Sequence, residues 1–376
     1  MDRADLLNRM EILFPDNVAL ADLRRAYIDR DISSIFRLLE KLHDADLSDL
    51  RKAVMSENWH SVFRLIDEQY GDTYKDVKNA VFEEPNIWIL FRIMIDGVEP
   101  ADAFMTDLKK AMTQKNIHSL FRLVDTLNNN YLGLEVDEKL DHNDLKKFLL
   151  QDNPWSMFRV LSFLQDTSLV PGLKAMHAAQ VEFDPDSLSQ GQLNSKVWLI
   201  EELLKLDLDL GTVFLCAGWY GILATLMFEN GLKVKKIRNF DMDPQAEVVA
   251  EYFNRPWVID GWKYKSVTQD IHKINFKGHT YSAFNSKGKE VYQHDLPDTV
   301  INTSCEHIED FDAWYDSIPE GMIVVLQSND YEDIDEHVNT RASLEDFALQ
   351  TPMSEELYSG ELNLIKYTRF MRIGIK

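Results

Sequence analysis

The pattern of apolar and polar positions changes near residue 189 and divides the chain into two parts. Before this point, apolar residues recur at helical spacing in short segments, which predicts amphipathic helices. After it, short apolar runs alternate with helical stretches, which predicts strands and helices in turn. We therefore expect two domains, a helical one over residues 1–180 and an α/β one over residues 181–376.

One pattern recurs five times in the first part. Each copy has an Asp in one helical segment and a Phe-Arg pair in the next, with the Phe 14 or 15 residues after the Asp. An Asp or Asn stands five residues before each Phe, where a helix N-cap belongs. Each unit is thus predicted to contain a helix, a tight turn and a second, more apolar helix. The first residues of the five copies are Asp22, Asp49, Asp76, Asp107 and Asp144.

Such units cannot bury an apolar face alone, so they are expected to stack as an α-helical, solenoid-like array. The units are 27 to 37 residues apart, and residues 131–140 are expected to form an inserted loop. An array of this kind usually offers a surface to a substrate or partner protein. The repeated Arg either forms a row facing a ligand or pairs with acidic residues of the adjacent helix. We favour the second interpretation.

The second part predicts a mostly parallel sheet with helices on both faces. The two strands nearest the C-terminus are close in sequence and should pair antiparallel. A hairpin with its turn at residues 285–288 is expected as an insertion. Strands are expected over 212–216, 236–240, 264–267, 299–302, 322–327, 361–364 and 368–375, the hairpin over 277–294, and helices over 197–206, 222–230, 245–254, 311–318 and 343–350.

The first strand of this part ends in a glycine turn, Cys-Ala-Gly218-Trp-Tyr-Gly221, before a helix. The second strand ends at Asp241. Strand, glycine turn, helix, strand and acidic residue form the pattern of a nucleoside-binding Rossmann-type unit, because glycine lets the backbone approach the ligand and the carboxylate binds ribose hydroxyls. Alternatively, Asp241 caps the next helix, although Asp243 is better placed for that role.

Residues 189–376 resemble the class I S-adenosylmethionine-dependent methyltransferases, whose sheet has seven strands with the last one reversed. The likeness rests on the order of elements, on Gly218, Asp241 and Asp270, on Ser-Cys-Glu-His-Ile at 304–308, and on the closing segments from 358 and 367. It implies S-adenosyl-L-methionine as the cofactor. Gly218 and nearby amides would flank its methionine part, Asp241 would bind the ribose, and Asp270 the adenine amino group.

The resemblance also suggests further site residues. Gly221, Ser304 and Lys196 are assigned to the cofactor site, and Glu306 is assigned either to the cofactor or to a helix cap. His307 is the candidate base, with Asn302 orienting the site from the tip of the fourth strand. The chain departs from the family pattern at Phe214, where an acid is usual, and at Cys216 and Tyr220, where glycines are usual.

Composition narrows the possible partners. Lys and Arg number 40 against 63 Asp and Glu, a formal net charge of −23 that makes nucleic acid an unfavourable partner. The two cysteines allow no disulfide framework, and no Cys/His spacing indicates a structural zinc site, so no metal is assigned. The chain starts without a signal-peptide pattern and has no long apolar run, so we expect a cytoplasmic protein without a membrane span.

The sequence thus predicts a methyltransferase that acts on an O or N nucleophile of a small molecule or a protein side chain, with the helical part docking a substrate or partner. A transferase that uses the same cofactor to move a group larger than methyl is one alternative, and two others stay open. One is a non-catalytic interaction protein with a degenerate cofactor pocket, which the depleted glycine turn favours. The other is a nucleic-acid methyltransferase, against which the charge argues.

Overall fold

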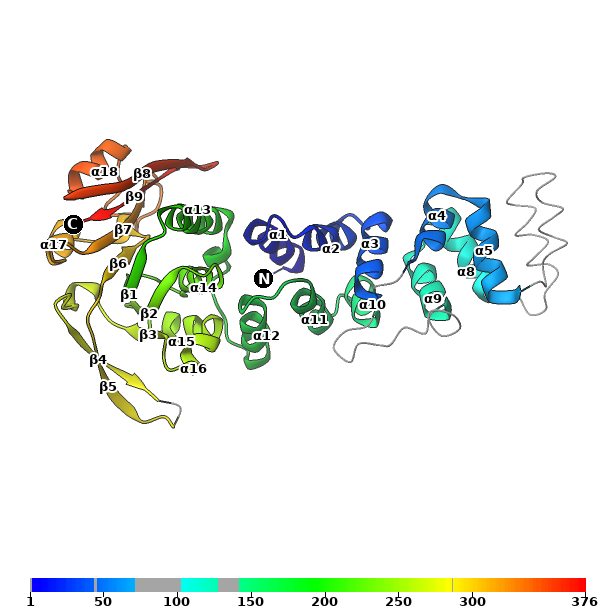
Figure 1. Cartoon of the computed structure of the whole chain (residues 1–376), viewed down its shortest axis with the longest axis horizontal. Coiled ribbons are helices and arrows are strands. Elements are labelled where there is room, and N and C mark those ends of the chain that lie inside the picture. Colours follow the sequence, from blue (N-terminus) through cyan, green and yellow to red (C-terminus); the bar gives the residue numbers. More distant parts are fainter. Residues whose placement is uncertain (1, 44–45, 72–102, 128–141, 286) are drawn as a thin grey trace. The chain divides into compact units, whose positions relative to one another are not determined.

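A computed structural model describes residues 2–43, 46–71, 103–127, 142–285 and 287–376. It divides into two compact units, Met1–Asp166 and Thr167–Lys376 (Figure 1). Among the described residues, no helix is both long and apolar enough to cross a bilayer. Each unit is described separately below.

The boundary between the units lies before the one expected at residue 180, because helix α12 (Leu169–Ala179) packs on α15 (Pro244–Phe253) of the second unit. The contact is close. A Cβ at Gly172 would lie 3.0 Å from the Tyr252 carbonyl oxygen, and Ser168 Oγ donates to the Phe253 carbonyl at 3.0 Å. The pattern of α12 is helical like that of the repeats, so the sequence alone did not reveal against which unit it packs.

The described part of the first unit consists of helices. Four of the five expected copies fall within it, and each consists of two consecutive helices that pack against each other. The copy that begins at Asp76 and the expected loop at 131–140 lie outside the described residues. The helices are α1 (Arg3–Leu13), α2 (Val18–Ile28), α3 (Ile32–His43), α4 (Ser48–Ser56), α5 (Trp59–Tyr70), α8 (Ala103–Gln114), α9 (Ile117–Leu127), α10 (His142–Gln151) and α11 (Pro154–Leu164).

The turn between the two helices has the same form in each described copy. A residue with positive φ comes first, such as Glu57 at 48°. The Asx residue follows and caps the second helix: Asn58 Oδ1 accepts from the Ser61 amide at 3.0 Å. The predicted N-caps are thereby confirmed in four copies, because Asp31, Asn116 and Asn153 accept the equivalent amides.

Each described copy also contains the same ion pair. Arg37 Nη2 of α3 donates to Asp22 Oδ1 of α2 at 2.7 Å, and Ser34 Oγ donates to the same carboxylate at 3.1 Å. The interpretation of the repeated Arg as an internal partner is therefore confirmed here, and a free row of Arg side chains facing a ligand is not found in these copies. The equivalent pairs are Arg64–Asp49, Arg122–Asp107 and Arg159–Asp144.

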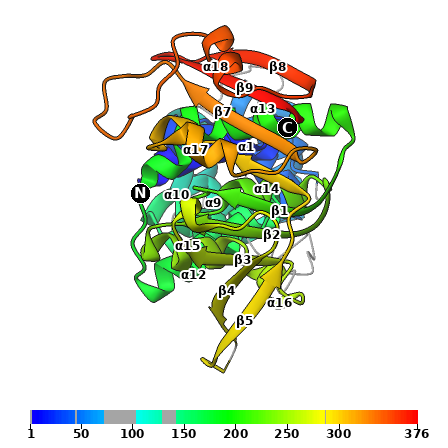
Figure 2. The ribbon, with the colours of Figure 1, turned by 90° about the vertical axis from the view of Figure 1, so that its left-hand side faces the viewer.

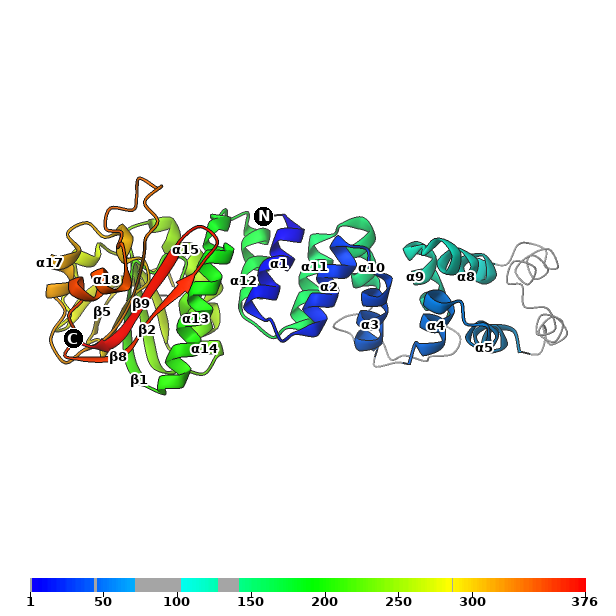
Figure 3. The same cartoon turned by 90° about the horizontal axis from the view of Figure 1, so that it is seen from above.

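The copies do not stack only on their sequence neighbours. Helix α2 contacts α11, α3 contacts α10, and α4 contacts α8, so within this unit the chain doubles back and forms two rows (Figure 3). The Tyr27 ring stacks on Phe148 with centroids 4.6 Å apart, and Tyr27 also donates to Asp152. A one-dimensional array, in which each repeat meets only the next, does not describe these contacts.

The second unit contains the predicted seven-stranded sheet. Its order is β3-β2-β1-β6-β7-β9-β8, and β9 runs antiparallel to both of its neighbours while the other strands are parallel. A reversed last strand is what the family resemblance implied. The strands are β1 (Asp209–Cys216), β2 (Lys233–Asp241), β3 (Tyr264–Thr268), β6 (Thr299–Asn302), β7 (Ile323–Asn329), β8 (Glu355–Asn363) and β9 (Thr368–Ile375).

Helices cover both faces of this sheet. Figure 1 shows α13, α14 and α15 along one face and α17 and α18 along the other. The inserted hairpin of β4 (His279–Phe284) and β5 (Glu290–Asp295) is antiparallel, as predicted, and extends away from the sheet (Figure 2). The remaining helices are α13 (Gln190–Leu206), α14 (Ile222–Glu229), α16 (Arg255–Ile259), α17 (Phe311–Asp316) and α18 (Leu344–Gln350), with short 3-10 turns η3 (Pro185–Leu188), η4 (Ile271–Lys273) and η5 (Cys305–His307).

The strand that carries the glycine turn, β1, lies in the interior of the sheet, and its residues from Thr212 to Cys216 are buried. Phe214 of β1 packs edge-to-face on Phe240 of β2, with ring centroids 5.0 Å apart, and this pair belongs to the core that includes Trp314 of α17. Parallel strands bring their carboxyl ends to one edge. The ends of β1, β2, β3, β6 and β7 therefore meet, and ligands of open α/β sheets bind at this edge.

Candidate functional site

A cavity of about 1330 Å³ lies at this edge of the sheet. Every residue that lines it belongs to the second unit. Its wall is formed by the start of α13, the turn after β1, the end of β2, the η4 and η5 segments, the loop after β7 and the hairpin between β8 and β9. A cavity of this size can hold a nucleoside-containing ligand together with a second molecule.

The turn after β1 has an unusual backbone. Ala217 and Trp219 have φ values of 53° and 46°, in the left-handed region that few side chains other than glycine adopt. Gly218 between them has no room for a side chain, because a Cβ would lie 1.9 Å from Asn239 Oδ1. Asn239 Nδ2 holds the turn by donating to the Trp219 carbonyl at 3.0 Å. Strain of this kind is concentrated at functional sites.

Gly221 does not line the cavity, so its predicted contact with a cofactor is not supported. Its φ is +64°, and a Cβ would lie 2.3 Å from the Tyr264 hydroxyl oxygen and 2.9 Å from Asn254 Nδ2. Glycine is required at this position because the side chains of Tyr264 and Asn254 pack directly against the turn. Gly221 therefore shapes the turn, and of these two glycines only Gly218 lines the cavity.

Asp241 stands where the ribose-binding acid was predicted. Its half-buried carboxylate lines the cavity, and it accepts from the Trp219 amide at 2.8 Å and from the Asp243 amide at 3.1 Å. Desolvation raises its pKa, although these amides lower it. Asp243 Oδ1 accepts from the Gln245 amide at 2.8 Å and caps α15, as predicted. Asp241 is thus not the helix cap.

The aromatic residues of the turn leave the cavity open. The Tyr220 hydroxyl accepts from the Asp184 amide at 3.1 Å, and the Tyr220 ring packs edge-to-face on Phe183. Trp219 stacks on Tyr220 with ring centroids 4.6 Å apart. Both rings belong to the cavity wall. Tyr220, which stands where a glycine is usual, and its neighbour Trp219 therefore do not fill the cavity.

Asp270 lines the cavity after β3, at the position predicted for adenine recognition. Its Oδ1 accepts from the His272 amide at 3.0 Å and so begins the η4 turn, while Lys273 lies 3.5 Å from its other oxygen. The carboxylate is half-buried. It keeps acceptor capacity for a ligand, since a carboxylate has about four lone-pair sites.

Lys196 is almost completely buried, although it carries an amine at the cavity wall. It lies on α13, which begins at Gln190 and not at residue 197 as predicted, with Ser189 accepting from the Gln192 amide. Lys196 Nζ donates to Gln192 Oε1 at 2.5 Å, and it forms no ion pair with a carboxylate of the described chain. Burial, followed by the charge of Arg369, lowers the pKa of Lys196 to about 7.

Asn302 does not line the cavity, and its predicted catalytic role stays a prediction. It is fully buried at the end of β6, and its Oδ1 accepts from the Ser304 amide at 2.8 Å. Its function is to shape the turn that carries the following residues. Ser304 itself is half-buried and lines the cavity, as expected for a cofactor-site residue.

Glu306 carries a buried charge at the cavity. Its side chain is 2% exposed, and its Oε1 accepts from Asn329 Nδ2 at 2.6 Å and from Arg369 Nη2 at 3.2 Å. Its Oε2 has no hydrogen-bond partner among the described residues. Glu306 is therefore not an exposed helix cap. One side of its carboxylate is held by the protein, and the other is free to bind a ligand.

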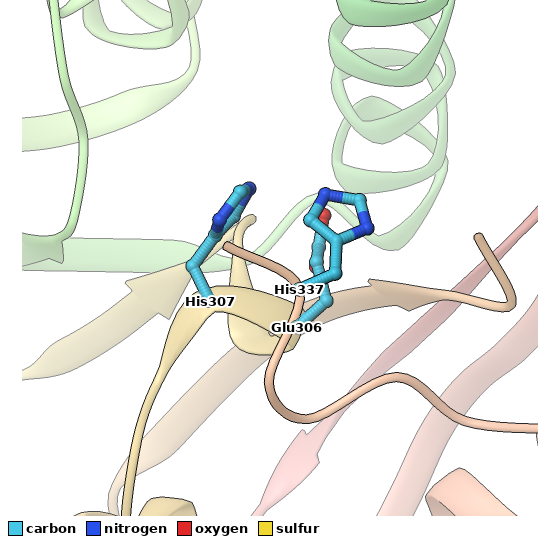
Figure 4. Close-up of side chains that lie close together, drawn as sticks. All are labelled: Glu306, His307 and His337. Atoms are coloured by element: carbon cyan, nitrogen blue, oxygen red, sulfur yellow. The ribbon is translucent and has the colours of Figure 1, made fainter. Parts of the chain in front are cut away.

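His307, the predicted base, follows Glu306 and lines the cavity beside His337 (Figure 4). The two rings are nearly perpendicular, with centroids 4.5 Å apart. His307 Nδ1 lies 3.1 Å from the Glu336 carbonyl, and His337 Nδ1 contacts the Tyr331 carbonyl. Partial desolvation lowers the pKa of His307, opposed by the charge of Glu306. One potential ligand atom from each of Glu306, His307 and His337 lies within 4.8 Å of the others.

His337 and Arg369 also line the cavity but were not predicted from the sequence. His337 lies 30 residues after His307 in an acidic loop, and Arg369 lies on the last strand. No local spacing connects these residues to Glu306. The available signal was the parallel order of β6 and β7, which puts the loops after both strands at one edge of the sheet.

No family model matches the chain, and no curated protein sequence does. Among solved structures, an N-methyltransferase, NodS, from Bradyrhizobium japonicum WM9 in complex with S-adenosyl-L-homocysteine is 11% identical with a TM-score of 0.38, over 55% of this chain and 98% of that one. A magnesium protoporphyrin IX methyltransferase, ChlM, from Synechocystis PCC 6803 is 10% identical with a TM-score of 0.36, over 56% and 97%.

A putative sarcosine dimethylglycine methyltransferase from Galdieria sulphuraria is similar to the same extent, with 11% identity and a TM-score of 0.36 over 55% of this chain and 98% of that one. These scores are too low to carry a functional argument. The proposal below therefore rests on the sheet and on the residues around the cavity.

Proposed function

We propose that the second unit is a methyltransferase that binds S-adenosyl-L-methionine and transfers its methyl group to an oxygen or nitrogen nucleophile. The observation that carries this proposal is the half-buried carboxylate of Asp241 beside the strained turn at Gly218, both at the wall of one large cavity. A carboxylate after the second strand and a close-approach glycine after the first are what adenosyl recognition requires.

The residues present fit most of the cofactor. Asp241 has acceptor capacity for the ribose hydroxyls, and Asp270 for the adenine amino group. The amine of Lys196 suits the carboxylate of the methionine part. The methionine ammonium has no carboxylate on β1, because Phe214 is buried in the core at that position. The residues of the cavity therefore suit the ribose, the adenine and the carboxylate of the cofactor, but not its ammonium group.

The chemistry needs alignment more than it needs a strong base. When bound, the cofactor supplies a sulfonium methyl group, whose carbon accepts a lone pair from the nucleophile while the sulfur keeps the pair of the broken bond. The protein contributes position and the exclusion of water. The strained backbone at Ala217 and Trp219 is held from beneath by Asn239, so the cavity wall is rigid where the reacting groups would meet.

The acceptor is proposed to be a small molecule or a protein side chain. The net charge of −23 supports either of these over a nucleic acid. We also propose that the first unit docks a substrate or partner. The Arg–Asp pairs of its repeats are internal, so a partner would bind through other side chains.

Calorimetry with S-adenosylhomocysteine tests the proposal. We expect saturable binding to the full chain and an affinity about ten- to a hundredfold lower for Asp241→Asn, since a hydrogen bond to a charged group contributes about 1.5–3 kcal/mol. Asp243→Asn is the matched control. It makes the same chemical change two residues away, keeps a good N-cap for α15, and should bind like the unmodified chain.

The alternative function is a non-catalytic interaction protein with a degenerate pocket, which the absence of an acid at Phe214 favours. Lack of any heat with either S-adenosylmethionine or S-adenosylhomocysteine at about 1 mM, well above the Kd of a working site, would support that alternative. If Asp241→Asn and Asp243→Asn bound S-adenosylhomocysteine with equal affinity, Asp241 would not be a ligand-binding residue. The proposal that the chain binds the cofactor would still stand.

A further inference from the structure

The two histidines at the cavity wall are oriented in the same way. In each ring, Nδ1 faces a backbone carbonyl, that of Glu336 for His307 and that of Tyr331 for His337. These carbonyls accept, so Nδ1 of each ring carries the proton and Nε2 is left with a lone pair. This arrangement, with Nδ1 held by the backbone and Nε2 available, is the one found for histidines that bind metal ions.

The third member of the cluster is an acidic oxygen without a partner. Glu306 Oε2 is buried and accepts no hydrogen bond from the described chain, whereas Oε1 is held by Asn329 and Arg369. A buried carboxylate oxygen without a donor is costly. Figure 4 shows the Glu306 side chain behind the His337 ring, with the His307 ring opposite.

We propose that Glu306, His307 and His337 bind a divalent first-row transition-metal ion. Two imidazoles and one carboxylate are a ligand set that suits Zn²⁺ and its neighbours better than Mg²⁺. The potential ligand atoms lie within 4.8 Å of one another. Ligands of a tetrahedral ion with bonds of ~2.1 Å are about 3.4 Å apart. Binding of an ion would therefore draw these side chains together by at most about 1.4 Å.

The surrounding protein holds the cluster in place without an ion. The Asn339 amide donates to the Glu306 carbonyl at 2.9 Å, and Asn339 Nδ2 donates to the Cys305 carbonyl at 3.0 Å. These bonds tie the loop after β7 to the η5 turn and so bring His337 to Glu306 and His307. Supporting contacts of this kind orient metal ligands.

The charges nearby favour a cation on balance. Arg369 offsets the charge of Glu306, so that carboxylate alone would attract an ion weakly. The loop that carries His337 is strongly acidic and exposed, and raises the local concentration of cations. Its acidic residues are Asp330, Glu332, Asp333, Asp335 and Glu336.

Three protein ligands leave a coordination position open, and all three residues line the cavity. An oxygen of a substrate, such as a hydroxyl or carboxylate group, is the ligand expected to take this position. The ion would then fix an oxygen nucleophile beside the proposed methyl donor. Binding of the ion itself does not depend on methyl transfer and can be tested without it.

The experiment uses the full chain after removal of metals with a chelator. We expect titration calorimetry with ZnCl₂ to show one Zn²⁺ site, and the same titration with MgCl₂ to show weaker binding of Mg²⁺. Addition of CoCl₂ should give the visible absorption bands of a nitrogen-ligated Co²⁺ ion. His337→Ala should weaken Zn²⁺ binding at this site about a hundredfold or more, since even loss of a supporting contact costs 10–100-fold. His337 lies in a half-exposed loop, so the variant should fold.

His272→Ala is the matched control, because His272 lines the same cavity but lies outside the cluster. Its Zn²⁺ affinity and cobalt spectrum should be unchanged. Equal Zn²⁺ affinity of His337→Ala and the unmodified chain would overturn the proposal. The ion would then bind at another site, such as the His43–His142 contact of the first unit. Mg²⁺ binding as tight as Zn²⁺ binding would overturn the choice of a transition ion.

Discussion

Both units contain carboxylates that are largely removed from water, but their surroundings differ. In the first unit, Asp22 is 3% exposed and accepts from Arg37 and Ser34, and the same pair recurs in the other described copies. In the second unit, Glu306 keeps one oxygen without a partner, and the amine of Lys196 is buried without an ion pair in the described chain. Both of these residues face the cavity.

The difference separates polar groups that hold the fold from polar groups that bind a ligand. A buried group with all its partners stabilises one conformation, whereas an unpaired one costs free energy unless a ligand completes it. In the described repeats, the buried Asp side chains are paired with Arg and Ser side chains of the same copy. In our proposal, the unpaired groups of the cavity gain their partners only when a cofactor and a metal ion are bound.

The largest effect is expected at the turn that forms the cavity wall. Gly218→Ala would place a Cβ 1.9 Å from Asn239 Oδ1 and 2.6 Å from Leu215 Cγ, both buried. We expect a loss of about 3 kcal/mol in the free energy of unfolding, the upper range for overpacking, together with loss of cofactor binding. Denaturant titration measures the first effect and calorimetry the second.

Gly231→Ala provides the comparison for that variant. Gly231 lies in the turn after α14 of the second unit. A Cβ there meets nothing within 4 Å, and the strain expected for alanine comes from its φ of +69°. Its cost should be about 1 kcal/mol, with unchanged cofactor affinity. Equal losses of stability in the two variants would mean that the turn at Gly218 is not tightly packed.

The next effect tests the internal role of the repeat ion pair. Asp22→Ala removes the partner of Arg37 and Ser34, but the Arg37 side chain is 42% exposed and can return to water. Ser34 also retains a bond to Asp31 at 2.6 Å. We therefore expect a loss of about 1–2 kcal/mol in unfolding free energy and no change in cofactor affinity. A normal stability would show that the repeated pair does not hold the repeats together.

The sequence predicted most of the second unit because its signals are local. The strand at 299–302 is found at those residues, and the two strands of the predicted hairpin pair antiparallel. The start of α13 was placed late, because Gln190 to Asn194 are mostly polar and show no apolar period. The doubling back of the repeats was not predicted either, since contacts such as Tyr27 with Phe148 join copies far apart in sequence.

The candidate site was predicted in part for the same reason. Asp241 and Asp270 directly follow strands and could be placed by counting elements, and both line the cavity. Asn302 also ends a strand, but it is fully buried and does not line the cavity, which the strand pattern alone does not determine. His337 reaches the site only through the tether of its loop by Asn339. The sequence carries no signal for that tether.

The smallest effect concerns protons taken up with the ligand. Burial and the charge of Arg369 lower the pKa of Lys196 to about 7, while Asp186 and Glu306 act in the opposite direction. At about pH 8.5 the amine is therefore mostly neutral without ligand, and a bound carboxylate would restore its proton. We expect S-adenosylhomocysteine to bind with uptake of a fraction of a proton at that pH, decreasing toward zero near pH 6.

Calorimetry in buffers with different ionisation enthalpies measures this uptake. Lys196→Met should abolish it and weaken binding about tenfold, as expected for loss of one charged hydrogen bond. If the variant took up as many protons as the unmodified chain, Lys196 would not be the group that meets the ligand carboxylate. Glu306 would then be the remaining example, in this comparison with the paired Asp22, of a buried group left for a ligand.

A crystal structure with S-adenosylhomocysteine tests the central claim most directly. The account predicts the adenosyl group in the cavity at the carboxyl ends of β1 and β2, with its ribose hydroxyls donating to Asp241 and its methionine part beside Gly218. Density for the ligand elsewhere, or a cavity without it at saturating concentration, would contradict the account.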